Sequence, residues 1–207
     1  MAMTIALNDA GKRYNRDWIF RHLNFSFENG TAYAITGPNG SGKSTLLQAL
    51  SGAISFNEGK NHWRIDGKEI KTEDVYKYVS ICAPYLEVVE EFTLHEFLQF
   101  HSSFKPFLPG ITIEQISEET GLQHTGDKRI AQFSSGMKQR VKLAQCIFSD
   151  TLLVLLDEPC TNLDAAGIEL YHNLVEKYCS KRLVIVSSND KVEYSFCTGI
   201  INIVNYK

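Results

Sequence analysis

Residues 37–45 read Gly-Pro-Asn-Gly-Ser-Gly-Lys-Ser-Thr and match the pattern G-x-x-x-x-G-K-[ST]. A β-type run at residues 31–36 leads into this stretch, and a helical pattern starts at Lys43. Glycines allow successive backbone N–H groups to point toward an anion, and the start of a helix adds the positive end of its dipole. The stretch is therefore predicted to be a phosphate loop that binds a nucleoside triphosphate.

Two side chains of this loop have predicted roles of their own. Lys43 is expected to reach the β- and γ-phosphates as a point charge, and the hydroxyl of Ser44 is expected to bind Mg²⁺. The residues of the loop that are predicted to bind the nucleotide are Gly37, Pro38, Asn39, Gly40, Ser41, Gly42, Lys43, Ser44 and Thr45.

A second candidate site follows a fully apolar run at residues 152–156, where the chain continues with Asp157 and Glu158. Such a run is typical of a buried strand, and ligands gather at the carboxyl ends of strands in an α/β sheet. Asp157 is expected to hold Mg²⁺ through water, and Glu158 to orient or deprotonate the water that attacks the γ-phosphate. Two adjacent acids can also form a solvated turn, but a phosphate loop in the same chain favours the catalytic interpretation.

Short β-type runs alternate with helical patterns along the chain, which predicts a mostly parallel sheet flanked by helices. The expected strands are residues 3–8, 18–27, 31–36, 152–156, 182–187 and 199–204, with two more within 59–82 around Asp66-Gly67 and a charged stretch at 68–74. The expected helices are residues 43–50, 94–103, 113–120, 135–148 and 165–179. We expect a single domain, residues 1–207, with a small helical lobe at residues 85–150.

Composition and charge argue against several classes of protein. The 207 residues carry 21 Lys and Arg against 24 Asp and Glu, and without a basic excess no nucleic-acid partner is expected. The five cysteines form no C-x-x-C pair, which favours reduced, buried thiols. The longest apolar run, residues 152–156, is far shorter than the roughly 20 residues that span a bilayer. We expect a soluble, cytoplasmic protein.

Residues 133–144, Phe-Ser-Ser-Gly-Met-Lys-Gln-Arg-Val-Lys-Leu-Ala, resemble the signature motif of ABC-type ATPases, usually written LSGGQ and followed by a basic helix. Residues 159–164 look like the D-loop of that family, with Asp164 in its aspartate position, and Tyr14 stands where the family carries an aromatic residue that stacks on adenine. The resemblance covers residues 3–205. It implies the ABC-type P-loop NTPase fold, with a mostly parallel central sheet, an antiparallel β portion and a small inserted helical lobe.

The resemblance implies a head-to-tail dimer of two cassettes, which holds each ATP between the phosphate loop of one subunit and the signature of the other. The Ser134 hydroxyl and the backbone N–H groups at the helix start near Ser135 would then face a γ-phosphate. The binding residues implied outside the phosphate loop are Tyr14, Ser134, Ser135, Gly136, Met137 and Asp164. A separate transmembrane permease subunit is also implied, which would hold the chain on the inner face of the cell membrane.

Two positions depart from the family pattern. Where the family has a Gln that touches Mg²⁺ and the attacking water, this chain has Pro84, and Tyr85 or Glu87 would have to substitute for it. Where the family has a His that contacts the γ-phosphate, this chain has Asn189, which donates a neutral hydrogen bond but carries no charge. Losing a positioned polar group of this kind costs on the order of 2–4 kcal/mol of transition-state stabilisation, so slow intrinsic hydrolysis is expected.

The leading hypothesis is an ATP-hydrolysing subunit of an ABC transporter, with Glu158, Lys43 and Asn189 as its catalytic residues. A cassette that holds ATP without useful turnover, as the silent half of a heterodimer, is favoured by Pro84 and Asn189. A soluble ABC switch that acts outside transport is a further alternative. A small P-loop kinase is less consistent with the sequence, because it would have no use for residues 133–144.

Overall fold

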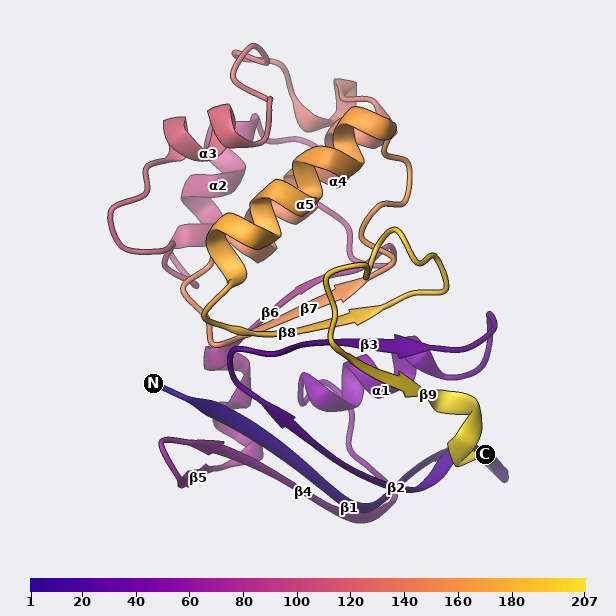
Figure 1. Cartoon of the computed structure of the whole chain (residues 1–207). Coiled ribbons are helices and arrows are strands. Elements are labelled where there is room, and N and C mark those ends of the chain that lie inside the picture. The colour runs from indigo at the N-terminus through magenta and orange to yellow at the C-terminus, as the bar shows by residue number, and fades with distance from the viewer. The chain divides into compact units, whose positions relative to one another are not determined.

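The computed structural model describes every residue of the chain, Met1–Lys207, and comprises two compact units (Figure 1). The sheet unit consists of Met1–Ile81, Thr151–Asp157 and Lys181–Lys207. The helical unit consists of Cys82–Asp150 and Glu158–Ser180. One boundary between the two units therefore falls between Asp157 and Glu158, the two adjacent acids of the predicted catalytic site.

One half of the sheet unit is an antiparallel sheet in the order β2-β1-β4-β5. Its strands are β1 (Met3–Tyr14), β2 (Asp17–Glu28), β4 (Glu58–Ile65) and β5 (Lys68–Ile70). The sequence predicts a first strand that ends at residue 8, but β1 continues to Tyr14. Register shifts near Leu7 and Asn8 let the strand pass Asp9, which has a left-handed φ of 54°.

The other half of the sheet unit is a five-stranded sheet in the order β6-β7-β8-β3-β9. Its strands are β3 (Ala32–Thr36), β6 (Val79–Cys82, the last residue of which belongs to the helical unit), β7 (Leu153–Asp157), β8 (Leu183–Ser187) and β9 (Gly199–Asn202). The neighbours β7, β8, β3 and β9 pair in parallel. The carboxyl ends of β3, β7 and β8 therefore lie at the same edge of the sheet, where ligands bind in α/β folds.

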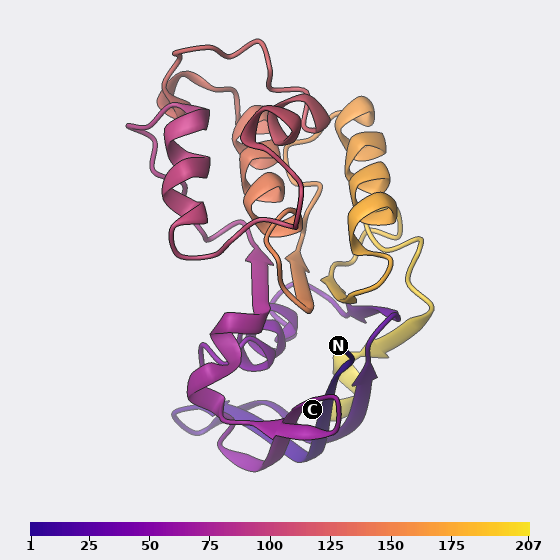
Figure 2. The ribbon, with the colours of Figure 1, turned by 90° about the vertical axis from the view of Figure 1, so that its left-hand side faces the viewer.

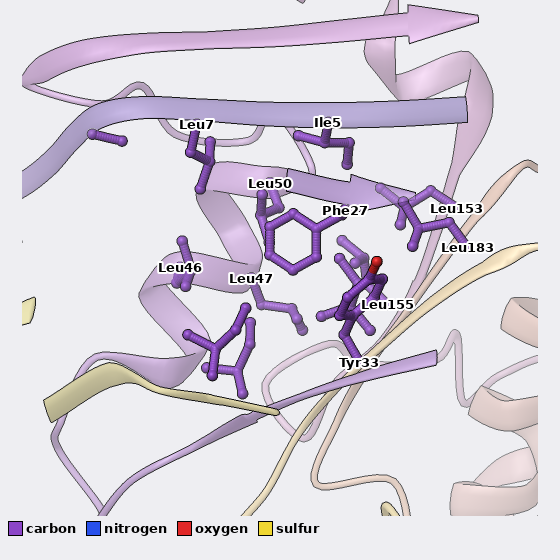
Figure 3. Close-up of a cluster of buried hydrophobic side chains, with 14 of the residues drawn as sticks. Ile5, Leu7, Phe27, Tyr33, Leu46, Leu47, Leu50, Leu153, Leu155 and Leu183 are labelled. Carbon is purple, nitrogen blue, oxygen red and sulfur yellow. The ribbon is translucent and has the colours of Figure 1, made fainter. Parts of the chain in front are cut away.

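Helix α1 (Lys43–Leu50) is anchored in the core of the sheet unit by its apolar face. Leu46, Leu47 and Leu50 are fully buried, and Figure 3 shows them beside the ring of Phe27. Burying each such leucine contributes about 1.5–3 kcal/mol. The indole N–H of Trp63 also donates to the carbonyl oxygen of Leu50 at 3.2 Å. These contacts fix the helix whose first residues form the end of the phosphate loop.

The helical unit contains α2 (Leu94–Ser102), α3 (Ile113–Glu119), α4 (Ser135–Ile147) and α5 (Ala165–Cys179). Helices α2 and α3 each begin with a capping box, Thr93 with Glu96 and Thr112 with Gln115. Helix α4 packs against α2 and α5, and Figure 2 shows these three helices next to one another. Nowhere in the chain does a helix combine the length and apolar character needed to cross a bilayer.

The predicted fold class is confirmed, with a parallel sheet, an antiparallel sheet and helices. The five predicted helices agree with the observed ones to within one residue at each end. Three 3₁₀ segments, Thr72–Tyr78, Ile130–Gln132 and Ile203–Tyr206, complete the secondary structure. Residues 68–70, predicted as part of a charged connection, form strand β5 after the predicted turn at Asp66-Gly67. The predicted last strand stops at Asn202, because its side chain accepts a hydrogen bond from the N–H of Val204 and starts a 3₁₀ turn.

Candidate nucleotide site

The phosphate loop lies between β3 and α1 in the sheet unit, and glycine is required at both of its ends. Gly37 has a φ of 143°, and a Cβ there would lie 2.8 Å from the Oγ of Ser41. Gly42, the N-cap of α1, has a φ of 105°, and a Cβ there would collide with the side chain of Ile19. Only glycine adopts these left-handed conformations without strain and leaves room for the neighbouring groups.

Lys43 is a charged residue with only 5% of its surface exposed. Its Nζ donates to the carbonyl oxygen of Gly37 at 2.8 Å and lies 3.5 Å from that of Pro38. An ammonium group has three protons to donate, so a further donor position is available for a ligand. Because burying a charge without an ionic partner is costly, this position favours an anion beside the loop.

Asn189, from the segment that follows β8, is hydrogen-bonded to the phosphate loop. Its Oδ1 accepts a hydrogen bond from the N–H of Gly37 at 3.1 Å, and its Nδ2 donates to the Oδ1 of Asn39 at 3.2 Å. The structure therefore brings this predicted catalytic residue to the loop, where its amide contacts the protein through both polar atoms.

Several buried oxygen atoms at the end of the parallel sheet have no hydrogen-bond partner. They include Oδ1 of Asp157, Oγ of Ser41 and Oγ of Ser187. Asp157 and Ser187 are paired residues at the ends of β7 and β8. A buried carboxylate oxygen without a partner is energetically costly, so the site is suited to a cation or a ligand proton donor.

These residues fit Mg²⁺. Magnesium prefers oxygen ligands and is commonly bound by one or two protein side chains together with phosphate oxygens and water. The Asp157 carboxylate and the Ser44 hydroxyl supply such ligands, and Ser44 is in the first turn of α1. The chain has no group of three His, Cys, Asp or Glu that could hold a metal ion without a substrate.

Glu158, the first residue of the helical unit after β7, has a φ of 44°, which is unusual for a residue with a side chain. Its carbonyl oxygen accepts two hydrogen bonds from Thr161, from the N–H at 3.2 Å and from Oγ1 at 2.8 Å. A backbone of this kind costs about 1–3 kcal/mol and persists where surrounding contacts hold it. The turn therefore fixes the backbone that carries the Glu158 carboxylate.

The predicted signature and D-loop residues surround one cavity of the helical unit, with a volume of about 320 Å³. The cavity is lined by Ser134, Ser135, Gly136, Met137, Arg140, Asn162, Leu163 and Asp164. The Oγ of Ser134 caps α4 by accepting a hydrogen bond from the N–H of Met137 at 3.2 Å, and its own proton remains available to a ligand. A Cβ at Gly136 would lie 3.0 Å from the carbonyl oxygen of Asn162, so glycine allows the close approach of the two segments.

The aspartate of the predicted D-loop is tied to the same two helices. Asp164 caps α5 by accepting a hydrogen bond from the N–H of Gly167 at 2.8 Å, and the guanidinium of Arg140 on α4 lies 3.8 Å from the same carboxylate. Because three-quarters of its side chain is exposed, this carboxylate is accessible to a ligand or a second chain.

Tyr14, the predicted adenine-stacking residue, is at the end of β1 in the sheet unit. The residue is 47% exposed, and the Nζ of Lys12 lies 5.2 Å from the centre of its ring. An exposed aromatic ring can stack on any nucleobase, and a nearby cation is compatible with a phosphorylated ligand.

The predicted site residues are divided between the two units. The sheet unit contains Tyr14, the phosphate loop, Asp157 and Asn189, and the helical unit contains Glu158, the signature residues and Asp164. Pro84, also in the helical unit, accepts a hydrogen bond from the Nζ of Lys142 through its carbonyl oxygen at 3.1 Å.

One residue of α4 that was not predicted from the sequence, Gln139, contacts the turn after Glu158. Its Nε2 donates to the carbonyl oxygen of Pro159 at 2.7 Å. A signal for its burial is present in the sequence, because Gln139, Leu143 and Cys146 have the i, i+4, i+7 spacing of one helix face.

Comparison with known proteins shows the family to which the chain belongs. A family model described as ABC transporter matches residues 20–161. An uncharacterised ABC transporter ATP-binding protein of Bacillus subtilis, YybJ, is 30% identical over 189 residues, which cover 90% of this chain and 86% of that protein. The lantibiotic transport ATP-binding protein SrtF of Streptococcus pyogenes is 30% identical over 190 residues, which cover 89% and 79% of the two chains.

A solved dimeric structure of a bacterial ABC transporter cassette superposes on 96% of this chain and 94% of its own, with a TM-score of 0.80 at 21% identity. The fold is thus that of the ATP-binding cassettes. With the family model and the relatives of similar length, the chain belongs to the ABC transporter family.

Proposed function

We propose that this chain is the ATP-binding and ATP-hydrolysing subunit of an ABC transporter, formed by a single nucleotide-binding domain. The observation that carries the proposal is that the sheet unit contains two buried, oppositely charged groups, each with hydrogen-bonding capacity that the protein does not use. Lys43 is a buried cation with donor capacity left over, and Asp157 is a buried acid with an unpartnered oxygen. A triphosphate with Mg²⁺ would satisfy both groups at once.

The chain's own residues would bind and orient the triphosphate as follows. The first N–H groups of α1 and the Lys43 ammonium would hold the phosphates, while the exposed ring of Tyr14 would stack on the base. Ser44 and Asp157 would hold Mg²⁺, which when bound would neutralise negative charge on the phosphates. Asn189 would keep the loop in its binding conformation through the two hydrogen bonds to Gly37 and Asn39.

Hydrolysis would depend on Glu158. Its carboxylate would accept the proton of the water that attacks the γ-phosphate, and the turn closed by Thr161 would set its backbone direction. Asn189 provides a neutral donor where a charged one would stabilise the transition state more strongly. We therefore propose that the intrinsic turnover of the chain is slow.

The cavity of the helical unit would bind the nucleotide of a second cassette. The N-terminus of α4, the free proton of Ser134 and the backbone N–H groups after it form a suitable site for a γ-phosphate. Two chains would then associate head to tail, as a homodimer or heterodimer. The dimer would close on ATP and open after hydrolysis. A separate transmembrane permease would receive this motion and keep the chain at the cytoplasmic face of the membrane.

A second candidate function is a cassette that binds ATP with weak or no turnover and pairs with an active cassette. The observation that favours it is the engagement of Asn189, because both polar atoms of its amide are bound to the phosphate loop. Lys43, Ser44, Asp157 and Glu158 are all present, which favours the first proposal.

The deciding experiment is steady-state ATP hydrolysis by the purified chain with Mg²⁺, beside its Glu158→Gln variant. Removing a general base lowers the rate by about 10²–10⁴-fold, so the variant should be almost inactive while ATP binding is retained. Glu169→Gln, which changes an exposed carboxylate on α5, is the control and should keep the full rate. A wild-type rate equal to that of Glu158→Gln would contradict hydrolysis and favour the ATP-holding cassette.

Association is tested with the same variant. If two cassettes close on ATP, Glu158→Gln should elute as a dimer with ATP and Mg²⁺ and as a monomer after the nucleotide is removed. Ser134→Ala in the Glu158→Gln background should weaken that dimer, because the hydroxyl on the α4 cap is lost. A dimer that forms equally well without ATP would refute nucleotide-driven closure.

A further inference from the structure

Gln139 is a polar residue on the buried face of α4, with only 3% of its surface exposed. Its Nε2 donates to the carbonyl oxygen of Pro159 at 2.7 Å and lies 3.7 Å from the Sγ of Cys82. All of these residues belong to the helical unit. A short hydrogen bond in a buried position is strong, and leaving either partner unpaired there would be costly.

Pro159 immediately follows Glu158, so the carbonyl that Gln139 holds belongs to the turn that carries this acid. The turn is held at two points. Thr161 donates twice to the carbonyl of Glu158, and Gln139 donates to the carbonyl of Pro159. Because proline fixes its own φ, the direction of the Pro159 carbonyl is tied to the ψ of Pro159 and to the strained residue before it, whose φ is 44°.

We propose that Gln139 is a positioning residue for Glu158: it holds the turn from α4, the helix whose first turn carries the signature residues. The inference rests on the proposed hydrolysis by Glu158 and adds a residue to it. Helix α4 begins at Ser135 and contains Gln139 in its second turn, so the signature residues and Gln139 lie on one rigid element. A movement of the signature helix is thereby transmitted to the backbone of the general base.

The test uses the full chain and a substitution that keeps the size of the side chain. Gln139→Met removes the donor to the carbonyl of Pro159. Thr120→Val is the matched control, because it removes a buried hydrogen bond of the helical unit, from Oγ1 of Thr120 to the carbonyl of Ile116 at 2.7 Å, away from the turn.

The first readout is amide hydrogen exchange over residues 158–163, with the N–H of Thr161 as the reporter. Gln139→Met should accelerate exchange at Thr161 about tenfold, whereas Thr120→Val should change it less than about twofold. Unchanged exchange in Gln139→Met, or equal acceleration in both variants, would overturn the proposal, because the amide would then only fill space or stabilise the unit in general.

The second readout separates catalysis from binding. Gln139→Met should lower kcat about tenfold and leave the Kd for ATP within about twofold of wild type. In the Glu158→Gln background, the same substitution should cause no further loss, because the two residues act through one group. Full kcat in Gln139→Met, or an additive loss in the double variant, would overturn the proposal. If the wild-type chain shows no hydrolysis, the proposed function fails, and the exchange comparison still decides whether Gln139 holds the turn.

Discussion

Replacing Asn189 by alanine should weaken nucleotide binding by the phosphate loop. The side chain joins the segment after β8 to the loop through hydrogen bonds to the N–H of Gly37 and the Oδ1 of Asn39. Gly37 is at the strand end of the loop, whereas the N–H groups proposed to hold the phosphates are those at the start of α1. The two hydrogen bonds therefore support the loop without competing with the ligand.

The magnitude follows from the two bonds that are lost. Both are at least partly accessible to water, so each contributes near the lower limit for a protein hydrogen bond, about 0.5 kcal/mol. If the loop has to regain this order when the ligand binds, the loss of about 1 kcal/mol raises the Kd about fivefold.

The assay is a titration with fluorescently labelled ADP and Mg²⁺, which measures binding without hydrolysis. Asn24→Ala is a close control in the antiparallel sheet, since Asn24 also accepts one hydrogen bond, from the N–H of Asp9 at 2.8 Å, and donates another, to the carbonyl of His22 at 3.1 Å. It should leave the Kd unchanged. A Kd for Asn189→Ala within about twofold of wild type, or a tighter one, would refute the reasoning that the amide pre-orders the loop.

Three further predictions concern other parts of the chain. Burial lowers the pKa of His101 to about 4 from its ordinary 6.5, so the unfolded chain binds more protons than the folded chain between these two pH values. Because His101 is partly exposed, the free energy of unfolding should fall by only about 1 kcal/mol as the pH is lowered from 7.5 to 5. Urea unfolding at both pH values should show this loss in wild type and not in His101→Gln. Gly67→Ala should lower the free energy of unfolding by about 1 kcal/mol because of its left-handed backbone, and Gly59→Ala should lower it clearly more, because its Cβ would also collide with the backbone of Asp9. Equal melting temperatures of the two variants would exclude the collision as a cause. Calorimetry should show that Tyr14→Ala weakens ATP binding by about 1–3 kcal/mol and that Tyr14→Phe binds ATP as wild type does. If the Phe variant binds ATP as weakly as the Ala variant, the ring does not stack on the base.

The helices and the order of the elements could be predicted because each is encoded locally. Threonine followed three residues later by Glu or Gln marks the starts of α2 and α3, and the Asp66-Gly67 pair marks the hairpin between β4 and β5. The phosphate loop could be predicted for the same reason, because its backbone is left-handed at Gly37 and Gly42, where glycine is needed.

The parts that could not be predicted depend on contacts between distant segments. The continuation of β1 to Tyr14 requires bulges that only its partner strands reveal. The left-handed backbone of Glu158 is held by Thr161, and neither residue type indicates it in isolation. Similarly, the sequence shows that Gln139 faces the apolar side of a helix, but not that Pro159 receives its hydrogen bond.

Asn189 illustrates how a departure from a family pattern acquires a physical meaning. From the sequence, the substitution is a loss, because an amide cannot carry the charge of a protonated histidine. In the structure the same amide makes two contacts with the phosphate loop. If these contacts persist when ATP is bound, Asn189→His would remove the support of the loop while restoring a chargeable group near it. The expected result is weaker binding with a higher kcat, and a histidine variant that binds as tightly as wild type would show that support and catalysis are separable at this position.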